Sequence, residues 1–304
     1  PVIMKNLRYK DITQIKRVDI ENIMLEKQKH PYEANRILAL LRKIFNFAID
    51  IELMASNPCQ GVKAYKEHKR NTYLKTEYID SAKRLLLTTN NINEQAIALM
   101  LFTGARKMEV LSSDKKEFDL NSKVWKKPPE KTKTSIEHIV PINNHALYIL
   151  RKLIKDEKDG FVFLNSKTGS HIKEVRKTWD SLKRRIVLYH LARKIVLKKL
   201  TEFDTLKDRK MFLKFELNGK SLQRLDSSEL MAILLKYKAK TDKQLKEVMP
   251  LRIHDIRHTF ASILVSKGVP LQTVGGLMGH TTSKTTERYA HLCDHSLRDA
   301  IEYL

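Results

Sequence analysis

Histidine and arginine stand three positions apart at His254 and Arg257. On a helix this spacing places both side chains on one face, so that the imidazole and the guanidinium converge on one point. A guanidinium offers a rigid fork to two phosphate oxygens, and an imidazole exchanges protons near neutral pH. The pair is therefore suited to chemistry on a phosphodiester. Taken alone, it is equally consistent with a surface helix that carries incidental basic residues.

A histidine and a tyrosine near the end of the chain form a second candidate pair. His280 ends the segment 277–280, and Tyr289 follows it across a Ser/Thr-rich turn and an expected helix start. The chain has 10 tyrosines, and a tyrosine in such a position is more often a packing residue than a nucleophile. Tyr289 becomes a candidate nucleophile because of the motifs that accompany it.

The charge of the chain points to a polyanionic partner. Lysine and arginine outnumber aspartate and glutamate by 58 to 35, which gives a formal charge of +23 spread along the 304 residues. Such a surface binds a polyanion because each neutralised phosphate releases condensed counterions. A solvated basic surface without a partner is the alternative.

Cysteine usage and hydropathy indicate the cellular compartment in which the protein works. Cys59 and Cys293 lie far apart, without the spacing of a zinc site or a disulfide framework, which fits a reducing, cytosolic setting. No apolar run reaches the roughly 18 residues that span a bilayer, and the first residues lack the order of a secretory signal. We therefore expect a cytoplasmic protein without membrane contact. Because the chain opens on Pro1 rather than Met, we also expect that an upstream segment is missing.

Helical periodicity and its breaks predict the domain organisation. Apolar residues recur at three- and four-residue steps between residues 12 and 53, and an Asn-Pro pair ends this region. We therefore predict a small helical domain at residues 1–62, N-terminally truncated, a charged linker at 63–72, and a second domain at 73–304.

The second domain is predicted to be mostly helical with one strand region. Residues 76–101 show a helical pattern, residues 103–106 form a turn that opens a short helix, and β-formers gather between about 118 and 142. Residues 186–249 are rich in lysine and leucine and carry no motif, so we interpret them as a helical insertion. Residues 252–304 are predicted to form several short helices broken at glycines.

Three motifs in order resemble those of the tyrosine recombinases, also called the phage integrase family. Residues 103–109 resemble the first arginine motif of the family and place its arginine at Arg106. Residues 254–258 resemble the His-x-x-Arg box, and His280 and Tyr289 resemble the terminal histidine and tyrosine. Three motifs in the expected order are much more specific than one.

The resemblance also implies a lysine at the tip of a β-hairpin. Lys133 stands at the family's offset from residues 139–141, and Lys131 is the alternative. The implied catalytic set is Arg106, Lys133, His254, Arg257, His280 and Tyr289.

The family mechanism gives each of these residues a task. The two arginines would clamp nonbridging phosphate oxygens, and His280 would donate a hydrogen bond to one of them. His254 would accept the proton of Tyr289, whose ordinary pKa of about 10 keeps the phenol protonated. Lys133 would protonate the 5′-oxygen that leaves. Because the bond energy stays in a 3′-phosphotyrosyl link, the resemblance implies rejoining without ATP, and we expect no cofactor and no metal ion.

The implied fold is mainly α. It combines a small helical core-binding (SAM-like) domain, which residues 34–58 resemble, with a mostly α (α+β) catalytic domain that carries a small antiparallel sheet. The two would close as a C-shaped clamp round double-stranded DNA. The implied assembly is a homo-oligomer, a tetramer on two DNA sites with inverted repeats. Such an enzyme would work at the prokaryotic nucleoid in the integration, excision or transposition of a mobile element.

The sequence is also compatible with two rival functions. A type IB topoisomerase or a telomere resolvase-like enzyme uses a similar cationic pocket and a tyrosine, although the integrase-like first domain argues against it. A non-catalytic DNA-binding regulator would keep the clamp fold, yet every catalytic position is filled. The insertion could be a DNA-contacting arm, a partner-docking element or a solvated decoration, and we favour the first slightly.

Residues beside the motifs have structural interpretations. Glu109, three positions after Arg106, is interpreted as an orienter of that arginine. His258 is interpreted as a buried, hydrogen-bonded histidine and His291 as a surface residue. The two tryptophans are interpreted as core anchors.

Overall fold

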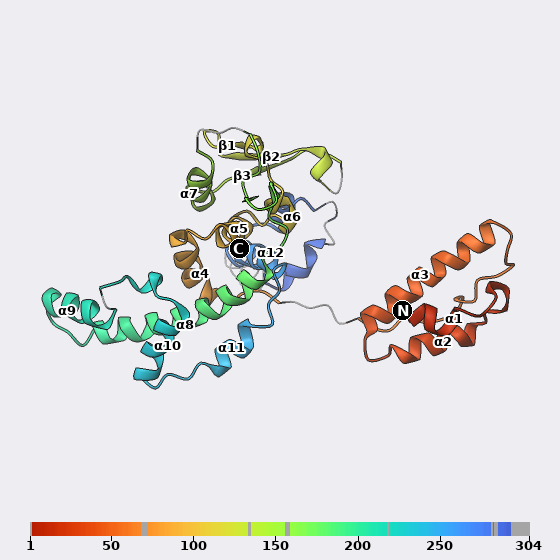
Figure 1. The fold of residues 1–304 in the computed structure, drawn as a ribbon, viewed down its shortest axis with the longest axis horizontal. Helices are drawn as coiled ribbons and strands as arrows, with labels where there is room; N and C mark the ends of the chain where they lie inside the picture. Colours follow the sequence, from red (N-terminus) through yellow and green to blue (C-terminus); the bar gives the residue numbers. More distant parts are fainter. Residues whose placement is uncertain are drawn as a thin grey trace, which may run out of the picture. The chain divides into compact units, whose positions relative to one another are not determined.

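The computed structural model describes residues 2–67, 72–132, 135–155, 159–217, 219–280, 282 and 285–292 of the chain. The chain divides into two compact units, Pro1–Arg70 and Asn71–Leu304 (Figure 1). Lys133, the predicted hairpin lysine, lies outside the described residues.

The first unit is helical. Its elements are α1 (Val2–Leu7), the 3-10 helix η1 (Ile12–Gln14), α2 (Arg17–Glu26) and α3 (Pro31–Asp50). Pro31 begins α3 at a position where the missing N–H costs no intrahelical bond. The apolar face of α3 is buried through Ala34, Leu38, Leu41, Phe45 and Ala48. It packs against Ile20 and Ile23 of α2 to form the core of this unit.

α5 is the central helix of the second unit. The helices around it are α4 (Thr76–Thr88), α5 (Ile92–Thr103), α6 (Lys107–Leu111), α7 (Asn144–Leu153), α8 (Arg176–Leu200) and α12 (Asp255–Ser266). Every residue of α5 from Glu94 to Thr103 is buried, because α4, α7, α8 and α12 pack around it. A helix that is apolar on all sides needs such a cover. The turn that follows α5 therefore starts from the centre of the unit.

The predicted strand region forms a small antiparallel sheet, as the family resemblance implied. Its strands are β1 (Phe118–Asp119), β2 (Val124–Lys127) and β3 (His138–Pro141), in the order β1-β2-β3, with the short helices η2 (Lys115–Glu117) and η3 (Pro129–Lys131) beside them. Trp125 pairs with Val140 in the register of β2 and β3. The buried indole stacks on Phe118 and donates its Nε1–H to Glu117 at 2.9 Å. Trp125 therefore anchors the sheet to the core.

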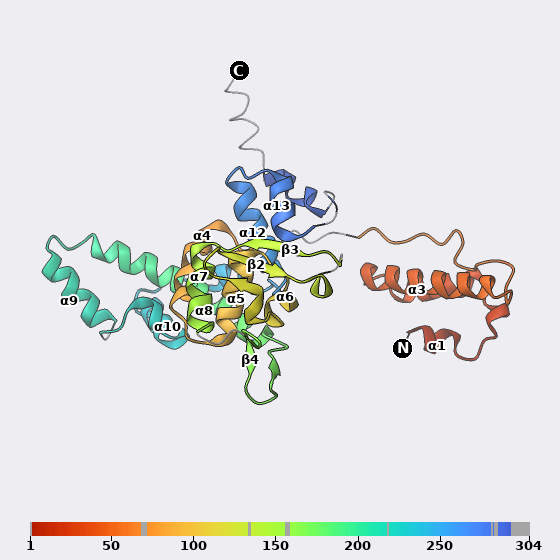
Figure 2. The same cartoon turned by 90° about the horizontal axis from the view of Figure 1, so that it is seen from above.

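A second sheet was not predicted. β4 (Leu164–Asn165) and β5 (Ser170–His171) form a two-stranded antiparallel hairpin, visible in Figure 2 near the label β4. Strands of two residues have no alternation of apolar and polar positions from which a sequence pattern could be detected.

The predicted insertion at 186–249 begins inside α8 rather than at the boundary of an element. It continues with α9 (Leu206–Glu216), η4 (Leu222–Arg224), α10 (Ser227–Lys236) and α11 (Asp242–Val248). Ile186 and Val187 of α8 share the main core of the unit with Leu230 and Leu234 of α10. Figures 1 and 2 both place α9 at the far end of α8. This stretch is therefore packed into the unit through α8 and α10, while α9 lies at its outer end.

The last described elements carry two of the sequence motifs. α12 is followed by α13 (Leu271–Met278) and the 3-10 helix η6 (Glu287–Leu292). A separate apolar cluster joins them through Ala261, Val265, Val274, Met278 and Tyr289. The short helices predicted after residue 252 are thus confirmed as far as the described residues extend.

Candidate active site

Arg257 joins three of the sequence motifs. Its side chain is buried and donates from Nη1 to the carbonyl oxygen of Gly104 (2.8 Å) and from Nη2 to that of Met278 (2.6 Å). Gly104 belongs to the first arginine motif, and Met278 lies two positions before His280. Burial, and then the charge of Arg106, lower the pKa of Arg257 to about 10, so the guanidinium stays protonated at neutral pH. One side chain therefore holds together segments that lie far apart in the sequence.

The turn after α5 depends on Gly104. This residue has a φ of +66°, and its N–H donates to the carbonyl oxygen of Met100 at 2.9 Å, which ends the helix. A Cβ at this position would lie 2.3 Å from Cδ1 of Phe260, in addition to the strain of the positive φ. The turn delivers Arg106 to the N-cap position of α6.

Glu109 holds both the backbone and the side chain of Arg106. Its Oε2 accepts the backbone N–H of Arg106 at 3.1 Å, and its Oε1 accepts the Nη1–H at 2.6 Å. These are the contacts that an orienter of the arginine must make. The side chain of Arg106 is 37% exposed, whereas that of Glu109 is 9% exposed. A nearly buried carboxylate thus anchors a guanidinium that reaches solvent.

Lys127 is a charged residue of this site that the sequence analysis missed. It lies in β2, is 2% exposed, and places its Nζ 2.7 Å from Oε2 of Glu109. Burial opposes ionisation of Glu109, but Lys127 and Arg106 outweigh it and lower the pKa of the carboxyl to about 2. The sequence did contain a signal, because Trp125 and Lys127 are two positions apart in a strand and so share its inner face.

A pocket of about 350 Å³ lies beside these residues. Its lining includes Arg106 from α6, His138 from β3, and Gly279 and His280 after α13. Two of the predicted site residues, Arg106 and His280, therefore border one cavity although they come from distant parts of the second unit.

The end of α13 sets the position of His280. Gly279 has a φ of +65°, and the N–H groups of Gly279 and His280 donate to the carbonyls of Gly276 (3.0 Å) and Gly275 (2.9 Å). These two bonds form a Schellman motif. A Cβ on Gly279 would lie 2.8 Å from Cε1 of His138, whose Nε2 donates to the carbonyl of Gly276 at 2.9 Å. The end of α13 is thus fixed to β3 through His138, and this fixes the position of the backbone of His280.

The imidazole of His280 is neutral at neutral pH because its pKa is lowered. Its Nδ1 shares a hydrogen bond of 2.8 Å with Oγ1 of Thr286. Burial, and then the charges of Arg257 and Arg106, lower the pKa of His280 to about 4. When Thr286 donates this hydrogen bond, Nε2 carries the proton and can act as a donor.

Tyr289, the predicted nucleophile, contacts His258. The phenol hydroxyl shares a short hydrogen bond with Nδ1 of His258, and the centroids of the two rings are 5.8 Å apart. Burial raises the pKa of Tyr289 to about 12, although Arg288 and Arg257 act in the opposite direction. Burial, and then the nearby His254, lower the pKa of His258 to about 4. Both partners of this hydrogen bond are therefore neutral at neutral pH.

His254 precedes α12 rather than lying within it. It is the N-cap residue, and its ring meets that of His258 edge-on at a centroid distance of 5.1 Å. Desolvation, and then the charge of Arg257, lower the pKa of His254. His254 nevertheless has helical dihedral angles, and its carbonyl accepts the N–H of Arg257 at 3.1 Å, so the two residues share the first turn of the helix. The member of this motif that contacts the phenol is His258, four positions later. The sequence pattern predicts a buried, hydrogen-bonded histidine there, and its hydrogen-bond partner is the phenol itself.

Lys131, the alternative hairpin lysine, is engaged elsewhere. Its Nζ donates to the carbonyl of Ser112 at 2.7 Å and pairs with Glu117. These contacts tie Lys131 to the segment between α6 and β1. Lys133, and the side chain of His291, lie outside the described residues.

The described part of the chain contains neither a membrane-spanning helix nor a cluster of metal-binding side chains. No helix there is long and apolar enough to cross a membrane. In the same residues, no group of three or more His, Cys, Asp or Glu side chains is arranged to hold a metal ion.

Similarity to known proteins extends over most of the chain. A tyrosine recombinase XerC-like protein of Caldanaerobacter subterraneus subsp. tengcongensis is 25% identical over 96% of this chain and 71% of its own length. A tyrosine recombinase of Thermosipho africanus is 24% identical over 99% of this chain and 90% of its own. Among solved structures, the Tn1549 transposon integrase in complex with a circular intermediate DNA has the same fold, with a TM-score of 0.62, 17% identity, and coverage of 99% of this chain and 91% of that one.

The family model described as the phage integrase family matches residues 78–295, which include the first arginine motif, the His-x-x-Arg box, His280 and Tyr289. The match covers well over half of the chain. The chain therefore belongs to the phage integrase family of tyrosine recombinases, and it is a DNA strand-transferring enzyme of site-specific recombination.

Proposed function

We propose that the chain cleaves and rejoins double-stranded DNA at recombination sites through a 3′-phosphotyrosyl link to Tyr289. One observation carries this proposal. Arg257 bonds to Gly104 and to Met278, and this arrangement lets Arg106 and His280 border one pocket. A phosphodiester bound there meets fixed donors from separate segments of the chain, which is the arrangement that stabilises charge in a transition state.

Two arginines and a neutral histidine clamp the phosphate in this proposal. A guanidinium has five N–H donors. Arg257 donates two of its N–H groups to carbonyl oxygens, and the side chain of Arg106 donates one to Glu109. Each guanidinium therefore has further N–H groups that can donate to nonbridging phosphate oxygens. His280, with its proton on Nε2, donates one more hydrogen bond. Removing one such donor is expected to slow cleavage by about 10²–10³.

Cleavage forms a bond between the phenol oxygen of Tyr289 and phosphorus, and it breaks the bond from phosphorus to the 5′-oxygen. We assign the proton acceptor to His258 rather than His254, because Nδ1 of His258 already shares a hydrogen bond with the hydroxyl. Lys133 protonates the 5′-oxygen, a role that rests on its spacing and on the family resemblance. Rejoining is the reverse reaction, so the proposal includes neither ATP nor a metal ion.

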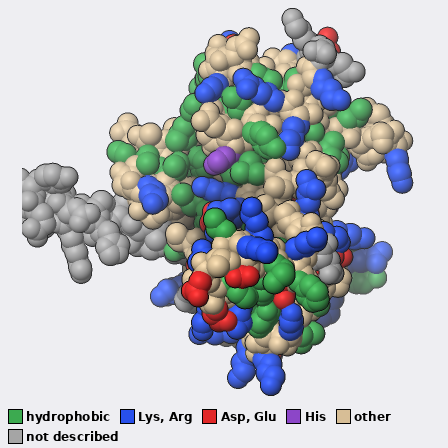
Figure 3. Space-filling view, turned by 90° about the vertical axis from the view of Figure 1, so that its left-hand side faces the viewer, with side chains coloured by type: hydrophobic (Ala, Val, Ile, Leu, Met, Phe, Trp, Pro, Cys, Tyr) green, Lys and Arg blue, Asp and Glu red, His purple; other side chains and the backbone are tan. Residues whose placement is uncertain are grey.

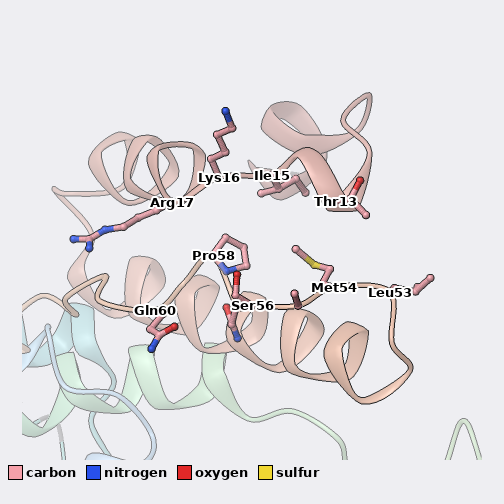
Figure 4. A pocket seen from close by; sticks show the side chains of 11 residues that line it. Thr13, Ile15, Lys16, Arg17, Leu53, Met54, Ser56, Pro58 and Gln60 are labelled. Atoms are coloured by element: carbon pink, nitrogen blue, oxygen red, sulfur yellow. The ribbon is translucent and has the colours of Figure 1, made fainter.

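Basic surfaces on the chain support DNA as the substrate. Figure 3 shows Lys and Arg side chains spread over one face of the molecule. In the first unit, a pocket of about 540 Å³ lies between the start of α2 and residues 53–60. Lys16 and Arg17 extend from the α2 side of this pocket (Figure 4). Cations in such positions neutralise phosphates and make affinity depend on salt.

The assembly and the biological role are proposed from the resemblance. A tetramer on two DNA sites with inverted repeats would act at the nucleoid in the cytoplasm. The likeness in fold to a transposon integrase supports the integration, excision or transposition of a mobile element.

A non-catalytic DNA-binding protein is the second candidate. The observation in its favour is that the hydroxyl of Tyr289 is buried and neutral in a hydrogen bond with His258. Such a protein would bind its sites tightly and form no covalent link to DNA.

A nicked substrate that traps the covalent intermediate separates the two candidates. Purified protein is incubated, without ATP or added metal, with nicked DNA from the attachment region of its own element, and adducts are resolved on a denaturing gel. We expect the wild-type chain and Tyr148→Phe, a substitution of an exposed tyrosine on α7, to form the adduct, and Tyr289→Phe to form none. Tight binding without any adduct would favour the non-catalytic candidate. An adduct in Tyr289→Phe would show that another residue is the nucleophile.

A further inference from the structure

Lys127 is a buried cation that the catalytic scheme above does not use. It is one of the least exposed charged residues of the described chain, and its Nζ lies 4.4 Å from the centroid of the Trp125 ring. In the inner face of β2 an apolar side chain would be the ordinary choice, because burying an ammonium is costly unless it is paired. Its pairing with Glu109 at 2.7 Å offsets that cost.

The two oxygens of Glu109 are divided between two cations. Oε1 accepts Nη1 of Arg106, whereas Oε2 faces Nζ of Lys127 and also accepts the backbone N–H of Arg106. The carboxylate therefore binds the guanidinium of Arg106 through one oxygen. Without the ammonium, Oε2 would still accept the backbone N–H of Arg106, but its other lone pair could accept a second N–H of the guanidinium, because arginine and carboxylate readily form bidentate pairs.

A bidentate pair with Glu109 would reduce the number of N–H donors that Arg106 can direct to a DNA phosphate. With one N–H on Glu109, the rest of the guanidinium is left for the pocket that His280 also borders. With two N–H groups on Glu109, one whole edge of the guanidinium would be turned toward the carboxylate and away from a phosphate. The position of Lys127 thus bears on how the phosphate is held, although Lys127 is not among the residues that line the pocket.

We propose that Lys127 is a positioning residue for strand cleavage: by occupying Oε2 of Glu109 it keeps Arg106 bound to that carboxylate through one oxygen, with the remaining donors directed to the scissile phosphate. This inference rests on the proposed role of Arg106 in phosphate binding. It makes Lys127 act through Glu109 and Arg106, without contact to the substrate.

Lys127→Met removes the charge and retains the length and apolar stem of the side chain. Lys126→Met, at the neighbouring exposed position of β2, is the matched control. We expect Lys127→Met to slow formation of the covalent adduct about tenfold or more, less than the loss of a direct donor. DNA affinity should stay within about twofold, and Lys126→Met should behave as the wild-type chain.

A second substrate distinguishes positioning from general damage to the fold. A methylphosphonate at the scissile position lacks one charged nonbridging oxygen, so it depends less on the arginine clamp. If Lys127 acts through Arg106, the defect of Lys127→Met should shrink on this substrate, as should that of Arg106→Ala. Equal slowing on both substrates would mean that Lys127 only supports the fold, and a wild-type rate would overturn the proposal directly.

The activity of the wild-type chain distinguishes failure of the proposed function from failure of the role proposed for Lys127. If the wild-type chain forms no adduct, the proposed function fails, and the inference fails with it. If the wild-type chain is active and Lys127→Met does not fold, Lys127→Arg replaces it. That variant keeps a cation near Oε2 of Glu109 and should retain most of the adduct rate on the phosphate substrate. A folded Lys127→Arg that is slowed equally on both substrates would contradict the proposal.

Discussion

The two sides of the candidate site hold their charges differently. The phosphate side consists of Arg106, Glu109, Lys127 and Arg257, and the tyrosine side consists of His258, Arg288 and Tyr289. On the phosphate side, ionised groups are held by short contacts, a carboxylate between two cations and a guanidinium on two carbonyls. On the tyrosine side, burial keeps the phenol and the imidazole neutral, with pKa values of about 12 and about 4.

This difference separates binding from activation. The phosphate side is ready to receive an anion before DNA arrives, because its donors are already oriented. Transfer of the phenolic proton to His258 is strongly unfavourable with the pKa values of the tyrosine side as they stand. A phosphate anion bound nearby would raise the pKa of His258, since an opposite charge favours the protonated imidazole. We therefore expect that bound DNA itself supplies part of the activation.

Among the substitutions considered, Arg257→Lys, on the phosphate side, should reduce the rate of adduct formation most. A single ammonium does not reproduce the fork that spans the carbonyls of Gly104 and Met278. We expect the adduct rate to fall by about 10²–10³. The unfolding temperature should fall by a few degrees, because a buried carbonyl loses its partner. Arg252→Lys, at an exposed position just before the His-x-x-Arg box, is the control. An adduct rate within about threefold of wild type would show that the joined motifs are not needed for chemistry.

Two histidines of the candidate site should make the stability of the fold depend on pH in the mildly acidic range. His258 and His280 have pKa values of about 4 in the folded chain, against an ordinary value of 6.5. Between these values the unfolded chain binds protons that the folded chain does not, so stability falls as the pH falls from about 6.5 toward 4. The contribution of each histidine is fully present above pH 6.5 and stops changing below pH 4.

Thermal unfolding measured between about pH 7 and pH 5 checks this sign. We expect the unfolding temperature of wild type to fall over this range and that of His258→Gln to fall less. His30→Gln, at an exposed position of the first unit, should follow the wild-type curve. If His258→Gln and wild type have parallel curves, the imidazole of His258 is not held neutral in the fold.

The contrast also shows what sequence patterns can and cannot reveal. The arginine, histidine and tyrosine motifs were readable because each lies within a short segment of fixed spacing. Gly104 and Gly279 were visible as breaks, since glycine ends helices with a positive φ. The fold class followed from the helical periodicity, from the β-formers between about residues 118 and 142, and from the family resemblance, and the structure confirms it.

Contacts made by tertiary packing were not readable in the same way. The hydrogen bond between His258 and Tyr289 joins α12 to η6 across 31 positions, and no local pattern encodes it. Lys127 lies among many lysines, and its importance appears only when the register of β2 places it behind Glu109. The insertion was placed by its composition, which does not mark the point inside α8 where the chain leaves the rest of the core.

Tyr289→Phe is expected to have the smallest effect on stability, and it tests one hydrogen bond of the tyrosine side. The substitution keeps the ring in the apolar cluster with Ala261 and Met278 and removes only the hydroxyl that bonds to His258. A half-buried nitrogen left without its partner costs about 1 kcal/mol. For a unit of this size, that lowers the unfolding temperature by about 2–4 °C. Tyr148→Phe should leave it unchanged, because that side chain is exposed on α7. If Tyr289→Phe unfolds at the wild-type temperature, the hydroxyl is not held by His258 in solution, and the nucleophile would already be free to reach the phosphate side before DNA binds.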